Sequence, residues 1–205
     1  TNHSTVNVAI SNYIAVVTMN NPPVNAQNRQ FHDDLTLAFD VLSDRNDVRS
    51  IVLTGAGKCF SAGADIKGRA SQESDLGDHW VHSRRVRECF YSIMECRKPV
   101  IAAINGAALG AGLAVAASAD ILIASESASV GLPEINVGLL GGGRHAMRLF
   151  SHSKTRRLML TGQRLSGAEL YRLGVVEECV LDDDLMRAAL EIAEELASKS
   201  PVAMS

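Results

Sequence analysis

Glu134 is the residue of this sequence best suited to acid–base chemistry. It follows Pro133 within the apolar stretch V-G-L-P-E-I-N-V-G-L-L at residues 130–140. Burying an unpaired carboxylate is costly, and a base held ready for proton transfer is one reason to keep a carboxylate in such a place. The alternative is a loop glutamate that points into water, and the residues alone do not choose between the two.

Two stretches of small residues are suited to presenting main-chain N–H groups: N-G-A-A-L-G-A-G at 105–112 and F-S-A-G-A-D at 60–65. Small residues let another segment or a ligand approach the backbone closely. If Leu109–Ala117 is a helix, its first N–H groups have no partner within that helix and can stabilise a carbonyl oxygen that gains negative charge. The amide of Ala64 could face a cavity in the same way. Close packing of helix on sheet is the alternative explanation.

Neither glycine-rich stretch fits a nucleotide-binding motif. Gly110-Ala111-Gly112 begins like a dinucleotide-binding motif, but Val115 stands where its third small residue belongs. The segment at 55–58, G-A-G-K, is no phosphate-binding loop, because Val52 replaces the first glycine and Cys59 follows the lysine. A dinucleotide-dependent oxidoreductase is therefore disfavoured.

The composition is typical of one globular domain and excludes several classes of protein. The 205 residues are 46% apolar and 21% charged, with a net charge of −3, which gives no support for binding nucleic acid or a membrane surface. Four cysteines without a C-x-x-C pair favour a reducing compartment, and with no signal peptide or membrane span in the sequence we expect a cytoplasmic protein. His79 and His82 have no evident third ligand, so we expect no metal site.

The order of the predicted elements indicates an α/β fold. Short apolar runs predict strands, and apolar residues at a period near 3.6 predict the helices between them. The expected strands are a hairpin over Val6–Met19 with Ser11-Asn12 at its turn, then Ser50–Thr54, Val100–Ile104, Ile121–Ala124 and Val175–Val180. The expected helices include one from Gln27 with Phe31, Leu35, Phe39 and Leu42 on one face, one with Val86, Phe90, Ile93 and Met94 inward, one capped by Ser166, and a final one after Asp184.

Three motifs together resemble the crotonase superfamily, and its enoyl-CoA hydratases most closely. They are F-S-A-G-A-D-I-K at 60–67, N-G-A-A-L-G-A-G at 105–112 and L-P-E-I-N-V-G-L-L-G-G-G at 132–143. The resemblance implies a spiral of ββα units over residues 1–182, with residues 183–205 starting a C-terminal helical region. The sequence stops at Ser205, where those helices would begin, so either the chain is incomplete or that region is missing or shortened. Members of the superfamily form trimers, often paired as hexamers.

The resemblance also assigns roles by motif position. The amides of Ala64 and Ala111 would bind the thioester oxygen of an acyl-CoA and stabilise the enolate, and Glu134 would carry the proton. The remaining residues expected at the substrate are Ala62, Asp65, Ile66, Lys67 and Gly110, with Lys58 and Lys67 placed for the CoA phosphates. Coenzyme A would enter as part of the substrate, and no other cofactor is expected.

One departure from the hydratase pattern bears on the reaction. Hydratases of this superfamily carry a first glutamate four residues after the position of Gly110, where this sequence has Ala114. A single base can still shift a double bond, so isomerisation is at least as plausible as efficient hydration. A non-catalytic acyl-CoA-binding protein remains the alternative from another functional class. Arg144 and His145 occupy small-residue positions, and either reach the pocket or lie on a solvated helix start.

Overall fold

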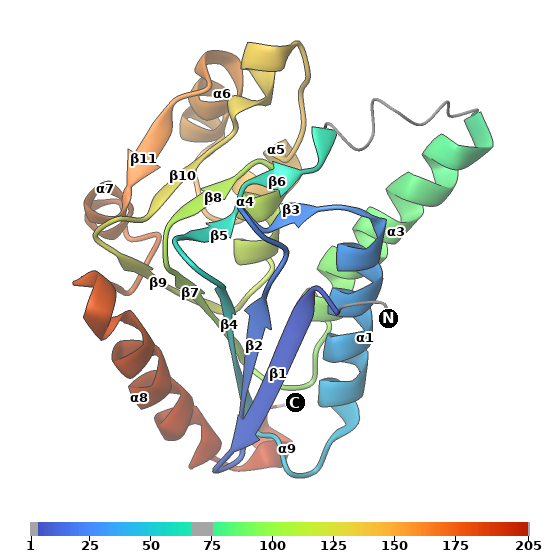
Figure 1. Cartoon of the computed structure of the whole chain (residues 1–205). Coiled ribbons are helices and arrows are strands. Elements are labelled where there is room, and N and C mark those ends of the chain that lie inside the picture. The colour runs from blue at the N-terminus through green and yellow to red at the C-terminus, as the bar shows by residue number, and fades with distance from the viewer. Residues whose placement is uncertain (1–3, 67–75, 205) are drawn as a thin grey trace.

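The chain folds as a spiral in which two strands are followed by a helix and the unit then repeats. The computed structural model describes residues 4–66 and 76–204. The first strands of successive units, β2 (Ile14–Met19), β4 (Ser50–Gly55), β7 (Val100–Ile104) and β9 (Ile121–Ser125), lie side by side and parallel in one sheet. The second strands, β3 (Ala26–Gln27), β5 (Cys59–Ser61), β8 (Ala107–Leu109) and β10 (Ser129–Gly131), belong to smaller sheets. The predicted α/β spiral of ββα units is confirmed (Figure 1).

The large sheet has the strand order β1-β2-β4-β7-β9-β12 within the described residues. At one edge β1 (Val6–Ser11) forms the predicted hairpin with β2, and at the other β12 (Glu178–Val180) runs parallel to β9. The hairpin turn is Asn12-Tyr13, one residue later than expected, with φ of 51° and 65°. Two central residues with positive φ match the twist of the strands, which explains this register.

Helices cover both faces of the large sheet. On one face lie α1 (Arg29–Asp44) and α3 (Leu76–Met94), and on the other lies α8 (Leu185–Ala197) (Figure 1). As predicted, α1 turns Phe31, Leu35, Phe39 and Leu42 into the core, and Asn28 caps it by accepting from the Phe31 N–H at 2.9 Å. Because α8 packs its alanines against β4 and β7, the sheet is buried on both faces. The division at residue 182 stays a prediction.

The stretch expected to be a helix over Leu109–Ala117 is a strand followed by a shorter helix. Residues 107–109 form β8, which pairs in parallel with β5 on one side and β10 on the other. The helix α4 (Ala111–Ala116) begins two residues later. Alanine has a low strand propensity, so the neighbouring strands rather than the local sequence determine this element.

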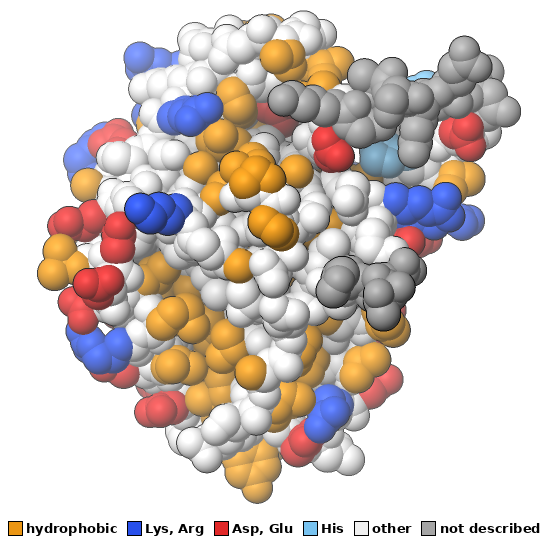
Figure 2. All heavy atoms as spheres, in the orientation of Figure 1, with side chains coloured by type: hydrophobic (Ala, Val, Ile, Leu, Met, Phe, Trp, Pro, Cys, Tyr) orange, Lys and Arg blue, Asp and Glu red, His pale blue; other side chains and the backbone are white. Residues whose placement is uncertain are grey.

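The C-terminal half completes the spiral with short elements. These are η1 (Pro133–Val137), α5 (Gly143–Ala146), α6 (His152–Thr161), β11 (Arg164–Ser166), α7 (Gly167–Arg172), η2 (Asp182–Asp184) and α9 (Pro201–Met204). No helix in the part of the chain that the structure describes is long and apolar enough to cross a membrane. Hydrophobic side chains gather on the lower part of the face shown in Figure 2, around the β1–β2 hairpin. An apolar groove of about 370 Å³ runs between β1 and α1 there.

Candidate active site

The turn from β8 into α4 forms the floor of the candidate site. Gly110 adopts φ 56° and ψ −119°, a conformation that side chains disfavour, and its N–H donates to the Gly131 carbonyl at 2.9 Å. Ala111 is the first residue of α4, so its N–H lies in the first turn, where the helix supplies no acceptor. This turn therefore presents the Ala111 amide as a donor at the start of a helix.

A second main-chain segment lies directly against this turn. Gly63 has φ +90°, and a Cβ on it would lie 2.5 Å from the Leu109 carbonyl oxygen and 3.2 Å from the Ala111 nitrogen. The Asp65 N–H donates to the Gln27 carbonyl at 3.0 Å. Because successive N–H groups of a strand point to opposite edges, the Ala64 N–H points away from β3. The segments that carry the Ala64 and Ala111 amides are thus in contact.

Glu134 faces the same turn. It lies in the first turn of η1, and a Cβ on Gly110 would collide with its Oε1 and lie 3.0 Å from its Cδ. A Cβ on Gly141 would lie 4.0 Å from Oε1, so two glycines make room for the carboxylate. Oε2 is buried and has no hydrogen-bond partner among the described residues. Burial raises the pKa of Glu134, and a hydrogen bond from its own backbone N–H offsets only part of this effect.

The other residues expected at the substrate surround the Ala64 segment. Ala62, Ala64 and Ile66 are exposed and Asp65 is half-buried. Lys67 lies outside the described residues. Lys58 is exposed. The edge next to the candidate donors is therefore open to solvent, as a surface for a large ligand must be.

Ala114 lies one helical turn beyond Gly110, and its side chain is only 2% exposed. Its N–H donates to the Gly110 carbonyl at 3.1 Å, and its carbonyl accepts from the Ser118 hydroxyl at 2.8 Å. The side chain belongs to the main hydrophobic core. The Ala114 side chain thus supplies no polar group to the site, and among the described residues Glu134 is the carboxylate that faces the turn.

The sequence did not decide whether Arg144 and His145 reach a pocket or lie in solvent, and the structure places the two side chains differently. Arg144 is exposed, whereas His145 is half-buried and its ring packs edge-on against Phe90, with 4.7 Å between ring centroids. Burial and the nearby Arg148 and Arg144 lower the pKa of His145. Both residues line a cavity of about 480 Å³ between α3 and α5. The alternative of a solvated helix start is therefore correct for the Arg144 side chain, which is exposed, and wrong for His145, which packs against Phe90.

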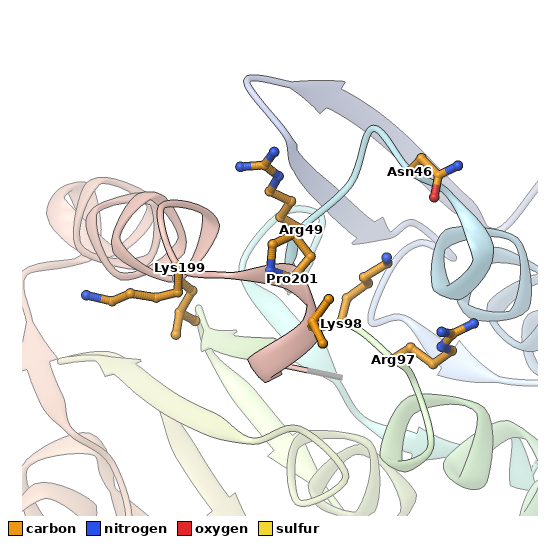
Figure 3. A pocket seen from close by; sticks show the side chains of 8 residues that line it. Asn46, Arg49, Arg97, Lys98, Lys199 and Pro201 are labelled. Carbon is orange, nitrogen blue, oxygen red and sulfur yellow. The ribbon is translucent and has the colours of Figure 1, made fainter.

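A basic cavity of about 320 Å³ lies elsewhere in the fold (Figure 3). Arg49 and Lys98 come just before β4 and β7, so the cavity is at the amino ends of these strands. Arg49 stacks on Tyr13 at 4.4 Å and donates to the Ala197 carbonyl, and Lys199 pairs with Glu195 at 3.2 Å. Arg97 and Lys199 extend in opposite directions (Figure 3). Arg49 and Lys199 thus have structural partners, and the cations of the cavity do not converge on one point.

Metal chemistry finds no support among the residues that are described. In residues 4–66 and 76–204, no group of three or more His, Cys, Asp or Glu side chains could hold a metal ion. His82 instead lies with its ring 6.1 Å from that of His32.

Two polar side chains beneath the site were not among the residues predicted from the sequence. Gln27 and Ser61 are buried, and their side chains meet at 3.2 Å behind the Gly63–Ala64 segment. Ser61 lies within the F-S-A-G-A-D motif, which was a signal that it belongs to the site. For Gln27 the sequence offers no such signal, because only the pairing of β3 with β6 (Gly63–Ala64) brings it there.

Comparison with known proteins agrees with this architecture. A family model described as enoyl-CoA hydratase/isomerase matches residues 9–205. A probable enoyl-CoA hydratase of Bacillus subtilis is 36% identical over 200 residues, which cover 96% of this chain and 77% of that protein. The (7aS)-7a-methyl-1,5-dioxo-2,3,5,6,7,7a-hexahydro-1H-indene-carboxyl-CoA hydrolase of Mycobacterium tuberculosis is 37% identical over 187 residues, covering 91% of this chain and 75% of that one. Among solved structures, DspI of Pseudomonas aeruginosa superposes with a TM-score of 0.91 at 34% identity, covering 98% and 84% of the two chains.

The chain belongs to the enoyl-CoA hydratase/isomerase family, and its fold is that of the crotonase superfamily. The resemblance found in the three motifs is thereby confirmed. Relatives of equal similarity carry the names of a hydratase and of a hydrolase, so similarity alone does not select the reaction.

Proposed function

We propose that this protein binds an unsaturated acyl-CoA thioester and catalyses its conversion through an enolate. The amides of Ala64 and Ala111 would donate to the thioester oxygen, and the Glu134 carboxylate would carry the proton. The observation that supports this most directly is the contact of Glu134 with Gly110, next to the Ala111 amide, with Oε2 buried and without a partner in the described residues. Donors fixed in advance favour the charge that develops on oxygen in the enolate.

Among the reactions of this family, we propose a shift of the double bond from position 3 to position 2. Glu134 would remove a proton from C2, so that the electron pair of the C2–H bond forms a C1–C2 double bond and the carbonyl π pair moves onto the thioester oxygen, giving a dienolate that keeps the C3–C4 double bond. Glu134 would then return the proton to C4: the carbonyl re-forms, the C1–C2 pair becomes the C2–C3 double bond, and the C3–C4 pair makes the new C4–H bond. The sum is an isomerisation without water, and it needs only one carboxylate. Hydration is the less favoured reaction, because Ala114 is apolar and buried.

The rest of the assignment follows from the family. Ala62, Asp65, Ile66 and Lys67 would border the CoA moiety, with Lys58 and Lys67 near its phosphates and Gly110 against the acyl group. The relatives' names contain CoA, which supports an acyl-CoA substrate. A place in fatty acid metabolism and the absence of a further cofactor are part of the proposal. A homotrimer or homohexamer in the cytoplasm is the assembly and location that we propose.

Turnover of two isomeric substrates tests the proposal. Purified protein is assayed with matched 3-enoyl-CoA and 2-enoyl-CoA, and we expect conversion of the first to exceed hydration of the second. Glu134→Gln keeps the size of the side chain and removes the base, so it should lose conversion by at least ~10²-fold. If Glu134→Gln converts either substrate as fast as the wild type does, Glu134 has no part in the mechanism. If the wild type hydrates 2-enoyl-CoA faster than it converts 3-enoyl-CoA, the isomerase assignment is overturned.

The replacement of the first glutamate by Ala114 also favours a second candidate function, binding without catalysis. Calorimetry with the same two thioesters separates the two proposals. Tight binding without turnover of either compound would establish the binding protein and exclude the enzyme.

A further inference from the structure

A buried polar cluster lies behind the segment that carries the Ala64 amide. It consists of Asn25, Gln27, His32 and Ser61, whose side chains are 0–2% exposed. Buried hydrogen bonds contribute little net stability compared with a well-packed apolar core, whereas they fix geometry closely. A polar cluster at this depth therefore calls for an explanation other than stability.

The Ser61 hydroxyl is the centre of the cluster. It donates to the Asn25 carbonyl at 2.7 Å, and it accepts from the Gln27 side-chain amide at 3.2 Å and from the Gly63 N–H at 3.3 Å. The last of these bonds holds the Ala62–Gly63 peptide group, which is followed by the Gly63–Ala64 peptide group that carries the Ala64 N–H. Three partners around one oxygen leave the hydroxyl no freedom to rotate.

The main chain of Ser61 also touches the segment that carries the other donor. A Cβ on Gly112 would collide with the Ser61 carbonyl oxygen and lie 2.9 Å from its carbonyl carbon and 3.0 Å from its Cβ. Gly112 directly follows Ala111 in α4. One residue thus contacts the neighbours of both candidate donors, Gly63 on one side and Gly112 on the other.

His32 determines which way the Gln27 amide faces. Its Nε2 lies 3.4 Å from the Gln27 Oε1. Burial, followed by the nearby His82, lowers the pKa of His32 to about 4, so the ring is neutral at neutral pH and Nε2–H can donate to this oxygen. With its oxygen toward His32, the amide must turn its N–H₂ group toward Ser61.

We propose that Ser61, held by Gln27 and His32, is a positioning residue that sets the relative placement of the Ala64 and Ala111 amides. This inference rests on the proposed function, since it concerns how the two donors are aligned on the thioester oxygen. Donor placement within about 0.5 Å decides how well developing charge is stabilised, so losing the Ser61 hydroxyl should act on turnover more than on substrate binding.

Ser61→Ala is the direct test, and Ser50→Ala is its matched control. Ser50 is equally buried, and its hydroxyl also donates to a main-chain carbonyl, that of Ala193 at 2.9 Å, against α8. We expect Ser61→Ala to lower kcat for an enoyl-CoA by ~10-fold or more with KM changed less than twofold, while Ser50→Ala leaves both within twofold. Equal effects of the two variants on kcat would overturn the proposal.

Gln27→Leu leaves the Ser61 hydroxyl in place but removes the Gln27 amide that donates to it. We expect a loss of kcat smaller than that of Ser61→Ala. A kcat equal to that of the wild type in Gln27→Leu would also overturn the proposal.

Infrared spectroscopy separates this proposal from the proposed function. The probe is 2-butenoyl-CoA labelled with ¹³C at the thioester carbonyl, bound to Glu134→Gln protein so that it is not consumed. Hydrogen bonds to the carbonyl lower its stretching frequency, so we expect a downshift on binding that is smaller when Ser61→Ala is added. No downshift in Glu134→Gln protein would overturn the proposed donors and with them this inference. An unchanged downshift after Ser61→Ala would overturn the positioning role alone.

Discussion

The carboxylate of Glu134 lies directly against the main chain of Gly110, where any side chain would collide with Oε1. The two residues are 24 positions apart and come from different turns of the spiral, η1 and the β8–α4 turn. The contact brings an acid–base group next to a main-chain donor, the Ala111 amide. It depends on a glycine that combines φ 56° with the absence of a Cβ.

Gly110→Ala should therefore abolish the site's geometry. The new methyl group must displace the Glu134 carboxylate, and a displacement of about 1 Å near the reacting atoms can cost ~10²-fold in rate. We expect kcat/KM for an enoyl-CoA to fall by at least that factor. Gly138→Ala is the matched control, because Gly138 also has positive φ (74°) but has no atom within 4 Å of its Cβ position. That variant should lose stability of about 1 kcal/mol and keep its activity.

Much of the fold could be predicted from the sequence. The first strand of each ββα unit is a short apolar run, and α1 has apolar residues at helical spacing. The missed elements depend on tertiary pairing: β8 is Ala107-Ala108-Leu109, a sequence with no strand preference of its own. For the site, the motifs predicted Ala64, Ala111 and Glu134, and the structure places Gly63 and Glu134 against the β8–α4 turn, while the roles of the three residues stay predictions. The Gln27 contact with Ser61 could not be predicted, since only the fold brings residues 34 positions apart together.

Ala111→Pro removes one proposed donor without changing a side chain that the mechanism uses. Proline is well tolerated at the first position of a helix, which Ala111 occupies in α4. Loss of one such donor typically lowers kcat by ~10²–10³-fold, and we expect a decrease of that size in steady-state turnover. His152→Pro, at the exposed first position of α6, is the control and should keep wild-type turnover. Full activity of Ala111→Pro would exclude the Ala111 amide as a donor.

Glu134→Gln should stabilise the fold at neutral pH. Burial raises the pKa of Glu134 above its usual value of 4.5, so the folded state binds this proton more tightly than the unfolded chain does. The stability contributed by the protonated carboxyl is complete below pH 4.5 and is lost as the pH rises through the folded pKa. The variant, which does not titrate, should thus gain in Tm relative to wild type between pH 4.5 and 7. The same change at exposed Glu178 should leave the difference in Tm constant across this range.

His32 should make the fold sensitive to mild acid. Burial and then His82 lower its pKa to about 4, with Arg85 acting in the same direction and Asp33 against it. In the unfolded chain the ring gains a proton near pH 6.5, so stability falls as the pH decreases from 6.5 toward 4. At pH 4.5 this effect lowers the free energy of unfolding by roughly 2–3 kcal/mol, and His32→Gln should lack the decrease.

Urea denaturation of wild type and His32→Gln at pH 7.5 and 4.5 measures this difference. The comparison uses the change with pH, so a constant cost of the substitution cancels. His152→Gln, at an exposed histidine, should follow the wild type, and an identical pH dependence of His32→Gln and wild type would show that His32 is protonated in the folded protein.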